Sequence, residues 1–264
     1  MPLHLFLSPH LDDAVLSCGG LIHRRARAGD DVLVLTIMAG DPEPGEQSAF
    51  AREKGQVWQA PEQPVARRRM EDRSALARLG ARWLHWPYPD CIYRHHPQSG
   101  VPLYPSRDAI FGDVHPLERS RLVEELAARL QALCEEVQPV AVYSLLTAGH
   151  HVDHLILQAA SQRLVPRGWV LRYYEDYPYA EDPVLLRAAL AAAGGVWQAE
   201  LELLDEADLA AKIEAVACYR SQFADLFGDE AAMRRRVSAY AYNLGSGCPA
   251  ERYWRPVTDS EATR

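Results

Sequence analysis

Residues 3–39 read LHLFLSPHLDDAVLSCGGLIHRRARAGDDVLVLTIMA, and this stretch decides the fold. Residues 3–8 form a short apolar run, as expected of one buried strand. Residues 11–28 carry apolar side chains near helical spacing and end at Gly29, a frequent helix stop. Residues 32–39 are a second apolar run, typical of a central strand covered on both faces. Because this connection is too long for a hairpin, the two strands are predicted to be parallel.

The alternation of strand and helix continues along the chain. Further strands are predicted at 82–86, 140–146, 170–175 and 196–203, and further helices at 67–79, 117–137, 151–164, 183–193 and 206–220. Residues 40–64 and 87–116 are expected to be two long loops, and the chain from 245 onward is expected to be irregular. The pattern predicts an α/β fold, doubly wound, with residues 1–264 forming one domain.

Composition and charge exclude several classes of protein. Hydrophobic residues make up 48% and charged residues 24%, which are the values of an ordinary folded domain. With 28 basic and 36 acidic residues the net charge is −8, so no nucleic acid or anionic membrane partner is expected. No apolar run is long enough to span a bilayer and no signal peptide is visible, which predicts a cytoplasmic protein and leaves its oligomeric state open. The five cysteines form no CxxC pair and are expected to be buried free thiols.

Two polar clusters each follow a predicted strand. The first is SPHLDD at 8–13 and the second is HHVDH at 150–154. Ligands of open parallel sheets collect at the carboxyl ends of strands, so both clusters can converge on one site. Imidazole and carboxylate groups suit zinc and similar divalent ions. His10, Asp13 and one histidine of the second cluster would supply three ligands, which leaves Asp12 as a general base and a further histidine as an acid or oxyanion donor.

Simpler explanations exist for each cluster. Asp12 and Asp13 could be helix caps, and the second cluster could be a solvated helix start. In that case the chain would be a non-catalytic α/β module that binds a small ligand. A dinucleotide site is not favoured, because the turn after the first strand lacks GxGxxG and two aspartates would repel a pyrophosphate. Gly19 and Gly20 lie inside the helix instead, as expected for close packing of that helix.

The motifs resemble those of a known family. Residues 8–13, followed by Cys18-Gly19-Gly20, resemble the PHxDD signature of the PIG-L/LmbE-like zinc N-deacetylases, and residues 151–154 resemble its HxDH signature. Weaker similarities span nearly the whole chain, at Arg68–Glu71, Pro89-Asp90 with Tyr93-Arg94, Tyr174–Tyr179 and Lys212–Gln222. The resemblance implies a Rossmann-like, three-layer α/β/α fold with a mostly parallel sheet. It also implies Zn²⁺, or another divalent transition metal, as the cofactor.

The resemblance also implies a role for particular residues. His10, Asp13 and His154 would bind the metal, Asp12 would be the general base, His151 would stabilise the oxyanion or protonate the leaving amine, Asp153 would orient an imidazole, and Arg68 and Asp90 would contact sugar hydroxyls. The chain departs from the usual motifs at Leu11, Ala14 and Val152, where backbone shape rather than metal binding is at stake. Gly149 stands where some members carry a tyrosine near the oxyanion, and His150 is an extra histidine expected at the rim.

The function predicted on this basis is hydrolysis of an N-acetyl group from an amino-sugar conjugate of N-acetylglucosaminide type. The metal would activate water and Asp12 would take its proton. The substrate would be a small molecule, with specificity residing in the two long loops. Their aromatic residues would stack on sugar faces or anchor the loops in the core, the latter being favoured for most of them; they are Phe50, Trp58, Trp86, Tyr88, Tyr93 and Tyr104. A metallo-amidase acting on a non-sugar N-acyl substrate is the remaining alternative.

Overall fold

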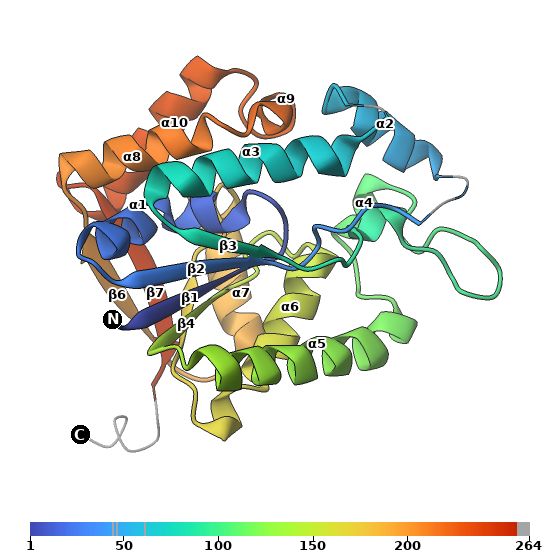
Figure 1. Ribbon diagram of the computed structural model, residues 1–264, viewed down its shortest axis with the longest axis horizontal. Helices are drawn as coiled ribbons and strands as arrows, with labels where there is room; N and C mark the ends of the chain where they lie inside the picture. The colour runs from blue at the N-terminus through green and yellow to red at the C-terminus, as the bar shows by residue number, and fades with distance from the viewer. Residues whose placement is uncertain (44, 46, 61, 258–264) are drawn as a thin grey trace.

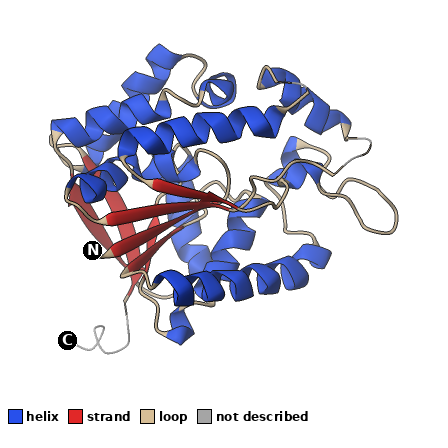
Figure 2. Cartoon of the chain, in the orientation of Figure 1, coloured by secondary structure: helices blue, strands red, loops and turns tan. Residues whose placement is uncertain are grey.

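A seven-stranded sheet lies at the centre of the protein, seen in a computed structural model that describes residues 1–43, 45, 47–60 and 62–257 (Figures 1 and 2). Its strands are β1 Leu3–Ser8, β2 Asp31–Thr36, β3 Arg82–His85, β4 Ala141–Leu145, β5 Leu171–Tyr174, β6 Trp197–Leu203 and β7 Ala250–Pro256. Their order in the sheet is β3-β2-β1-β4-β5-β7-β6. The first five are parallel, whereas β7 runs antiparallel to both neighbours. The expected α/β fold with a mostly parallel sheet is confirmed.

Helices cover both faces of this sheet, which gives three layers (Figure 1). One face carries α1 Asp13–Arg27, α3 Pro64–Leu79, α8 Glu206–Val216 and α10 Glu230–Leu244. The opposite face carries α5 Pro116–Val137 and α6 Val152–Gln162, and α7 Pro183–Ala193 follows β5 along the chain. The predicted boundaries agree with these elements to within a few residues, because apolar spacing and caps such as Gly80 mark them clearly.

Gly19 and Gly20 support close packing of α1, as expected. A Cβ atom at Gly20 would lie 2.3 Å from Leu204 Cδ1, and one at Gly19 would lie 2.9 Å from Lys212 Cγ. Both distances are shorter than any contact that a real side chain makes. The pair of glycines therefore lets α1 approach α8 and the residue after β6, rather than forming a phosphate-binding turn.

The two long loops are more ordered than the sequence suggests. Within 40–64, of which 44, 46 and 61 lie outside the described residues, the structure has helix α2, Ala49–Val57. Ser48 caps this helix by accepting a hydrogen bond from the Ala51 backbone N–H at 3.0 Å. Within 87–116 there is a 3₁₀ turn η1, Cys91–Tyr93, and a short helix α4, Arg107–Ile110. The remaining short elements are η2 Val165–Arg167, η3 Tyr179–Glu181, η4 Arg220–Gln222 and α9 Phe223–Leu226.

The expectation of an irregular chain after Gly245 is wrong, because residues 250–256 form β7. Charged residues interrupt the apolar pattern of this segment, so its hydrophobicity does not predict a strand. One of them, Glu251, is buried and accepts hydrogen bonds from the backbone N–H groups of Gly20 and Leu21 at 2.9 Å. Lys212 donates a further bond to the same side chain at 2.7 Å. Helix α10 was also not predicted. Residues 258–264 lie outside the described part of the chain.

The cysteines agree only in part with the expectation of buried free thiols. All five are free, and Cys18, Cys91 and Cys134 are buried. Cys218 is half-buried and Cys248 is exposed, contrary to that expectation. Among the described residues no helix combines the length and the hydropathy that a membrane crossing requires.

Candidate active site

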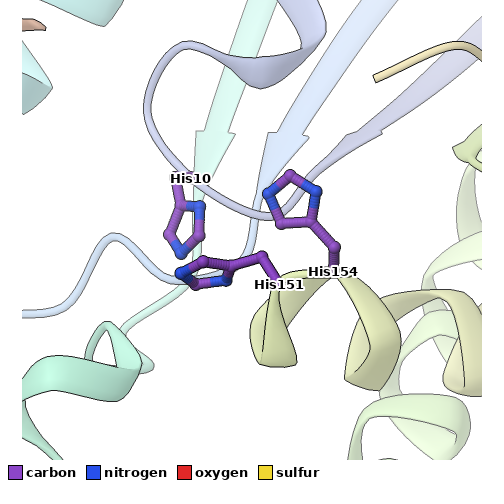
Figure 3. A group of neighbouring side chains, drawn as sticks. All are labelled: His10, His151 and His154. Carbon is purple, nitrogen blue, oxygen red and sulfur yellow. The ribbon is translucent and has the colours of Figure 1, made fainter. Parts of the chain in front are cut away.

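The candidate site lies where the order of the sheet reverses. From β1 the chain continues into α1 on one face, and from the neighbouring β4 it continues toward α6 on the other. Such a switch point opens a crevice at the carboxyl ends of the strands. His10 lies in the turn after β1, while His151 and His154 lie at the start of α6, and the three imidazoles point toward one another (Figure 3). The two sequence clusters therefore meet.

Helix capping does not account for the acidic pair. Asp12 occupies the N-cap position of α1, but its side chain makes no capping hydrogen bond. The Asp13 side chain instead accepts a hydrogen bond from the His10 backbone N–H, at 2.8 Å. The Asp13 carboxylate is thus directed toward the turn that carries His10, and the Asp12 carboxylate faces Arg68.

A solvated helix start does not account for the histidines either. His151 does cap α6, because its Nδ1 accepts a hydrogen bond from the Asp153 backbone N–H at 3.3 Å. However, the side chains of both His151 and His154 are buried. His150 is exposed with a left-handed backbone, in agreement with its expected place outside the cluster.

Two histidine nitrogens converge on one carboxylate oxygen. Asp13 Oδ2 lies 3.2 Å from His10 Nδ1 and 3.4 Å from His154 Nε2. The opposite nitrogens are held from behind by buried carboxylates. His10 Nε2 donates to Asp153 Oδ2 at 2.9 Å, and His154 Nδ1 donates to Asp176 Oδ1 at 2.8 Å. A carboxylate behind each imidazole is the usual support of a metal-binding histidine, because it fixes the tautomer and the orientation of the ring.

The imidazole of His151 lies beside those of His10 and His154. One nitrogen each of His10, His151 and His154 fall within 4.8 Å of one another (Figure 3). These three nitrogens form one candidate set of metal ligands, and the Asp13 oxygen, which lies beside His10 and His154, offers a carboxylate in place of His151. His151 Nε2 lies 3.8 Å from the Cys91 sulfur, and the His151 ring meets the His10 ring edge to face.

The electrostatics of the cluster favour a cation. Five carboxylates gather around the histidines, and two arginines pair with three of these carboxylates; they are Asp12, Asp13, Asp90, Asp153 and Asp176, with Arg68 and Arg94. Burial lowers the pKa of His154, but Asp13 and Asp176 outweigh it and raise that pKa to about 9. The pKa of His10 is likewise raised well above its usual value, because Asp90, Asp13 and Asp153 outweigh the effect of burial. The cluster thus attracts positive charge to the ring nitrogens.

Asp12 and His151 differ from His10 and His154, because burial favours the neutral form of both side chains and prevails in their pKa values. Burial raises the pKa of Asp12 to about 7, although the Arg68 guanidinium opposes the shift. Burial, together with His10 and His154, lowers the pKa of His151 well below its usual value. His151 is therefore a neutral imidazole near neutral pH. Because its Nδ1 accepts a backbone N–H, its proton is on Nε2.

Arg68 and Asp90 form part of the wall of a cavity over the histidines. Arg68 Nη2 lies 3.4 Å from Asp12 Oδ1, and Arg68 Nη1 lies 3.8 Å from Asp90 Oδ2. The guanidinium packs 4.7 Å from the centre of the Trp58 ring. The cavity has a volume of about 410 Å³. Its wall also includes Ile92, Phe111 and Tyr179.

Most of the loop aromatics anchor the loops rather than line this cavity. Trp86, Tyr93 and Tyr104 are buried in the core, and Phe50 and Tyr88 pack against it. Trp58 is the exception among the six, since it both packs in the core and borders the cavity. The favoured expectation of loop anchoring is therefore confirmed for most of them.

Two residues of the site were not assigned a role from the sequence. Asp176 and Tyr179 both belong to the segment 174–179, whose similarity to the family motif is weak. Tyr179 occupies the space that a side chain at position 149 would take, since a Cβ atom on Gly149 would lie 2.5 Å from its ring. Its ring meets those of Phe111 and His154 edge to face. The tyrosine-rich sequence after β5 was the available signal, but only the fold shows that it reaches the histidines.

Comparison with known proteins agrees with this geometry. Residues 5–165 match the family described as PIG-L, GlcNAc-PI de-N-acetylase. A 2'-N-acetylparomamine deacetylase from Niallia circulans is 29% identical over 98% of this chain and 93% of its own. A crystal structure of the zinc-inhibited form of a teicoplanin deacetylase superposes with a TM-score of 0.81 at 30% identity, covering 96% of this chain and 97% of the other. A deacetylase of the A40926 pseudoaglycone gives 0.75 at 27% identity, covering 95% of both chains.

Proposed function

Because the chain belongs to the PIG-L family of de-N-acetylases, we propose that it is a zinc-dependent hydrolase that removes an acetyl group from the nitrogen of an amino-sugar conjugate. One observation carries the proposal. Two histidines, each held from behind by a buried carboxylate, direct their other nitrogens to the same oxygen of Asp13 at the switch point of the sheet. That arrangement supplies the two-histidine, one-carboxylate ligand set of a catalytic zinc.

His10, Asp13 and His154 would hold the metal. Asp13 is preferred to His151 as the third ligand because its oxygen already lies beside both histidine nitrogens. His151 uses its Nδ1 to cap α6, which fixes the ring and directs a single protonated nitrogen, Nε2, to the cluster. The carboxylates that surround the three histidines fit a divalent cation.

Zinc, when bound, would polarise the amide carbonyl and acidify a water molecule. The residues of the chain would transfer the protons, stabilise the oxyanion and orient the ligands. Asp12 is buried, does not cap its helix and lies beside the positive Arg68, so it can take the proton of the attacking water. His151 would donate a hydrogen bond from Nε2 to the developing oxyanion, and the proton that Asp12 takes from the water would pass to the leaving amine. Asp153 accepts from His10 and keeps that ring in place.

The cavity would bind the sugar. Arg68 and Asp90 border it with a charged donor and a charged acceptor, which suits hydroxyl groups. Trp58 and Phe111 supply apolar faces. Tyr179 lines the same cavity, and its phenol donates no hydrogen bond to another described residue, which supports a contact with substrate. The relatives act on sugars of an aminoglycoside or a glycopeptide, so an antibiotic-like amino sugar is the substrate class we propose.

Acetate release tests this function directly. The purified protein is incubated with 2'-N-acetylparomamine and, separately, with a simple N-acetylglucosaminide, before and after dialysis against a chelator. We expect acetate release that the chelator abolishes and added zinc restores. Hydrolysis that persists after complete metal removal would refute the mechanism. Absence of acetate release from either substrate in the zinc-loaded protein would refute the substrate class.

A further inference from the structure

Arg94 lies behind the histidine cluster, and neither the sequence motifs nor the proposed mechanism gives it a role. We infer that Arg94 is a positioning residue of the metal site, which acts through Asp153 on His10. The inference rests on the proposed function, because it concerns the residues that would hold the metal. Arg94 does not border the cavity over the histidines, so it is not placed to touch substrate.

Asp153 connects Arg94 to the histidine. Arg94 Nη2 donates to Asp153 Oδ1 at 2.5 Å, while Asp153 Oδ2 accepts from His10 Nε2 at 2.9 Å. The backbone N–H of Cys91 donates to the same Oδ2 at 3.0 Å. The two oxygens of one fully buried carboxylate thus face opposite directions, one toward the arginine and one toward the imidazole. Fixing Oδ1 therefore fixes the direction in which Oδ2 holds His10.

Arg94 is itself held rigidly. Its Nη2 donates to Glu118 Oε2 at 3.1 Å and its Nη1 to the Pro89 carbonyl at 3.2 Å. Glu118 lies in the first turn of helix α5 and also accepts a hydrogen bond from the Tyr104 hydroxyl at 2.7 Å. All of these groups are buried or nearly so, and a charge-assisted bond is strong and directional in such surroundings. The arginine is therefore anchored to a helix while it orients the carboxylate.

The positive charge of Arg94 lies on the side of the histidine cluster where two carboxylates face His10. His10 Nε2 faces two carboxylates, because Asp90 Oδ2 lies 3.7 Å away in addition to Asp153. Two buried carboxylates at one nitrogen repel each other, and the guanidinium offsets that repulsion. On the other side, within the part of the chain that the structure describes, His154 Nδ1 contacts one carboxylate, that of Asp176, which accepts one backbone N–H, that of Ala148 at 3.1 Å. Arg94 therefore pairs with a carboxylate on the side of the cluster where two carboxylates lie close together.

Zinc affinity of the metal-free protein tests the inference without relying on activity. Zinc is titrated in competition with a chromogenic chelator into the wild type, Arg94→Met, Arg94→Lys, Asp153→Asn and the double variant Arg94→Met/Asp153→Asn. We expect Arg94→Met to weaken zinc binding about 10- to 100-fold, the usual cost of losing a group behind a ligand. Arg94→Lys keeps the charge and should recover at least part of that loss. The double variant should bind zinc no more weakly than Asp153→Asn alone, because Arg94 acts through Asp153.

The control is Lys212→Met, which breaks another buried ion pair, Lys212 with Glu251 at 2.7 Å, on a different part of the fold. It should lose stability but keep its zinc affinity. The inference is overturned if a folded Arg94→Met binds zinc as tightly as the wild type. If Arg94→Met does not fold, a double variant that binds zinc clearly more weakly than Asp153→Asn overturns it instead. A wild type that binds no zinc would refute the proposed metal site itself, which is a different result.

Discussion

Replacing Gly149 by alanine tests the packing that places Tyr179 beside the histidines. The new Cβ would lie 2.5 Å from two ring atoms of Tyr179 and 2.8 Å from a third, whereas ordinary contact begins at 3.4 Å. The ring must therefore move by roughly 1 Å. Residue 149 does not have a left-handed backbone, so the substitution adds no strain of its own.

The expected cost follows from this overlap. Overpacking of a rigid ring costs about 1–3 kcal/mol, and replacing glycine returns about 0.4–1 kcal/mol by restricting the unfolded chain. The net loss in the free energy of unfolding is about 1–2 kcal/mol, which corresponds to a fall in Tm of about 2–8 °C for a domain of this size. Because the displaced ring borders the cavity, acetate release should fall as well.

A double-mutant cycle isolates the cause. Chemical unfolding is measured for Gly149→Ala in the wild type and in Tyr179→Ala, which removes the ring. In the second background the alanine at 149 has space, so it should cost nothing or stabilise slightly, and the two sites should couple by about 1–3 kcal/mol. An equal cost of Gly149→Ala in both backgrounds would show that the overlap with Tyr179 is not the cause.

Three further substitutions test the proposed roles. Asp12→Asn removes the general base but no ligand, so turnover should fall about 10²- to 10⁴-fold while zinc content, measured by atomic absorption, stays at the wild-type level; unchanged turnover would contradict the assignment. Asp176→Asn removes the carboxylate behind His154, and chelator competition should show zinc binding weakened about 10- to 100-fold; wild-type affinity would exclude a supporting role. Trp58→Ala removes the face against which Arg68 packs, so KM should rise roughly tenfold while Trp58→Phe keeps most of the affinity; equal KM values for the two variants would argue against the stacking.

The sequence specifies the parallel core of this fold well. The apolar runs of β1 and β2 are covered on both faces, so they appear as continuous hydrophobic segments with a clear period between them. Strand β7 could not be found in this way. Its buried Glu251 accepts one hydrogen bond from the nearby Tyr253, but the charge of Lys212 and two backbone N–H groups of α1, which also stabilise it, come from residues that are far away in sequence.

The candidate site, like the sheet, has one part that the sequence predicts and another that depends on contacts between residues far apart in the chain. His10 and His154 follow β1 and β4, and the rule that ligands collect at the carboxyl ends of parallel strands predicts that these two histidines lie together. Their supports depend on tertiary contacts instead. Asp176 reaches His154 from the segment after β5, and Arg94 reaches Asp153 from the loop after β3. Neither residue lies at a spacing that marks a ligand, so only the folded chain shows what each one contacts.

The position of β7 also has a consequence for synthesis of the chain. Strand β6 leaves the ribosome before β7, yet β7 lies between β5 and β6 in the sheet. Until β7 is made, the edge of β5 stays open and β6 has no partner there. Unpaired edges of this kind pair with other chains. The residues proposed to hold zinc all precede β5, so a nascent chain that ends before β7 carries the whole ligand set on an unfinished sheet, and we expect such fragments to aggregate.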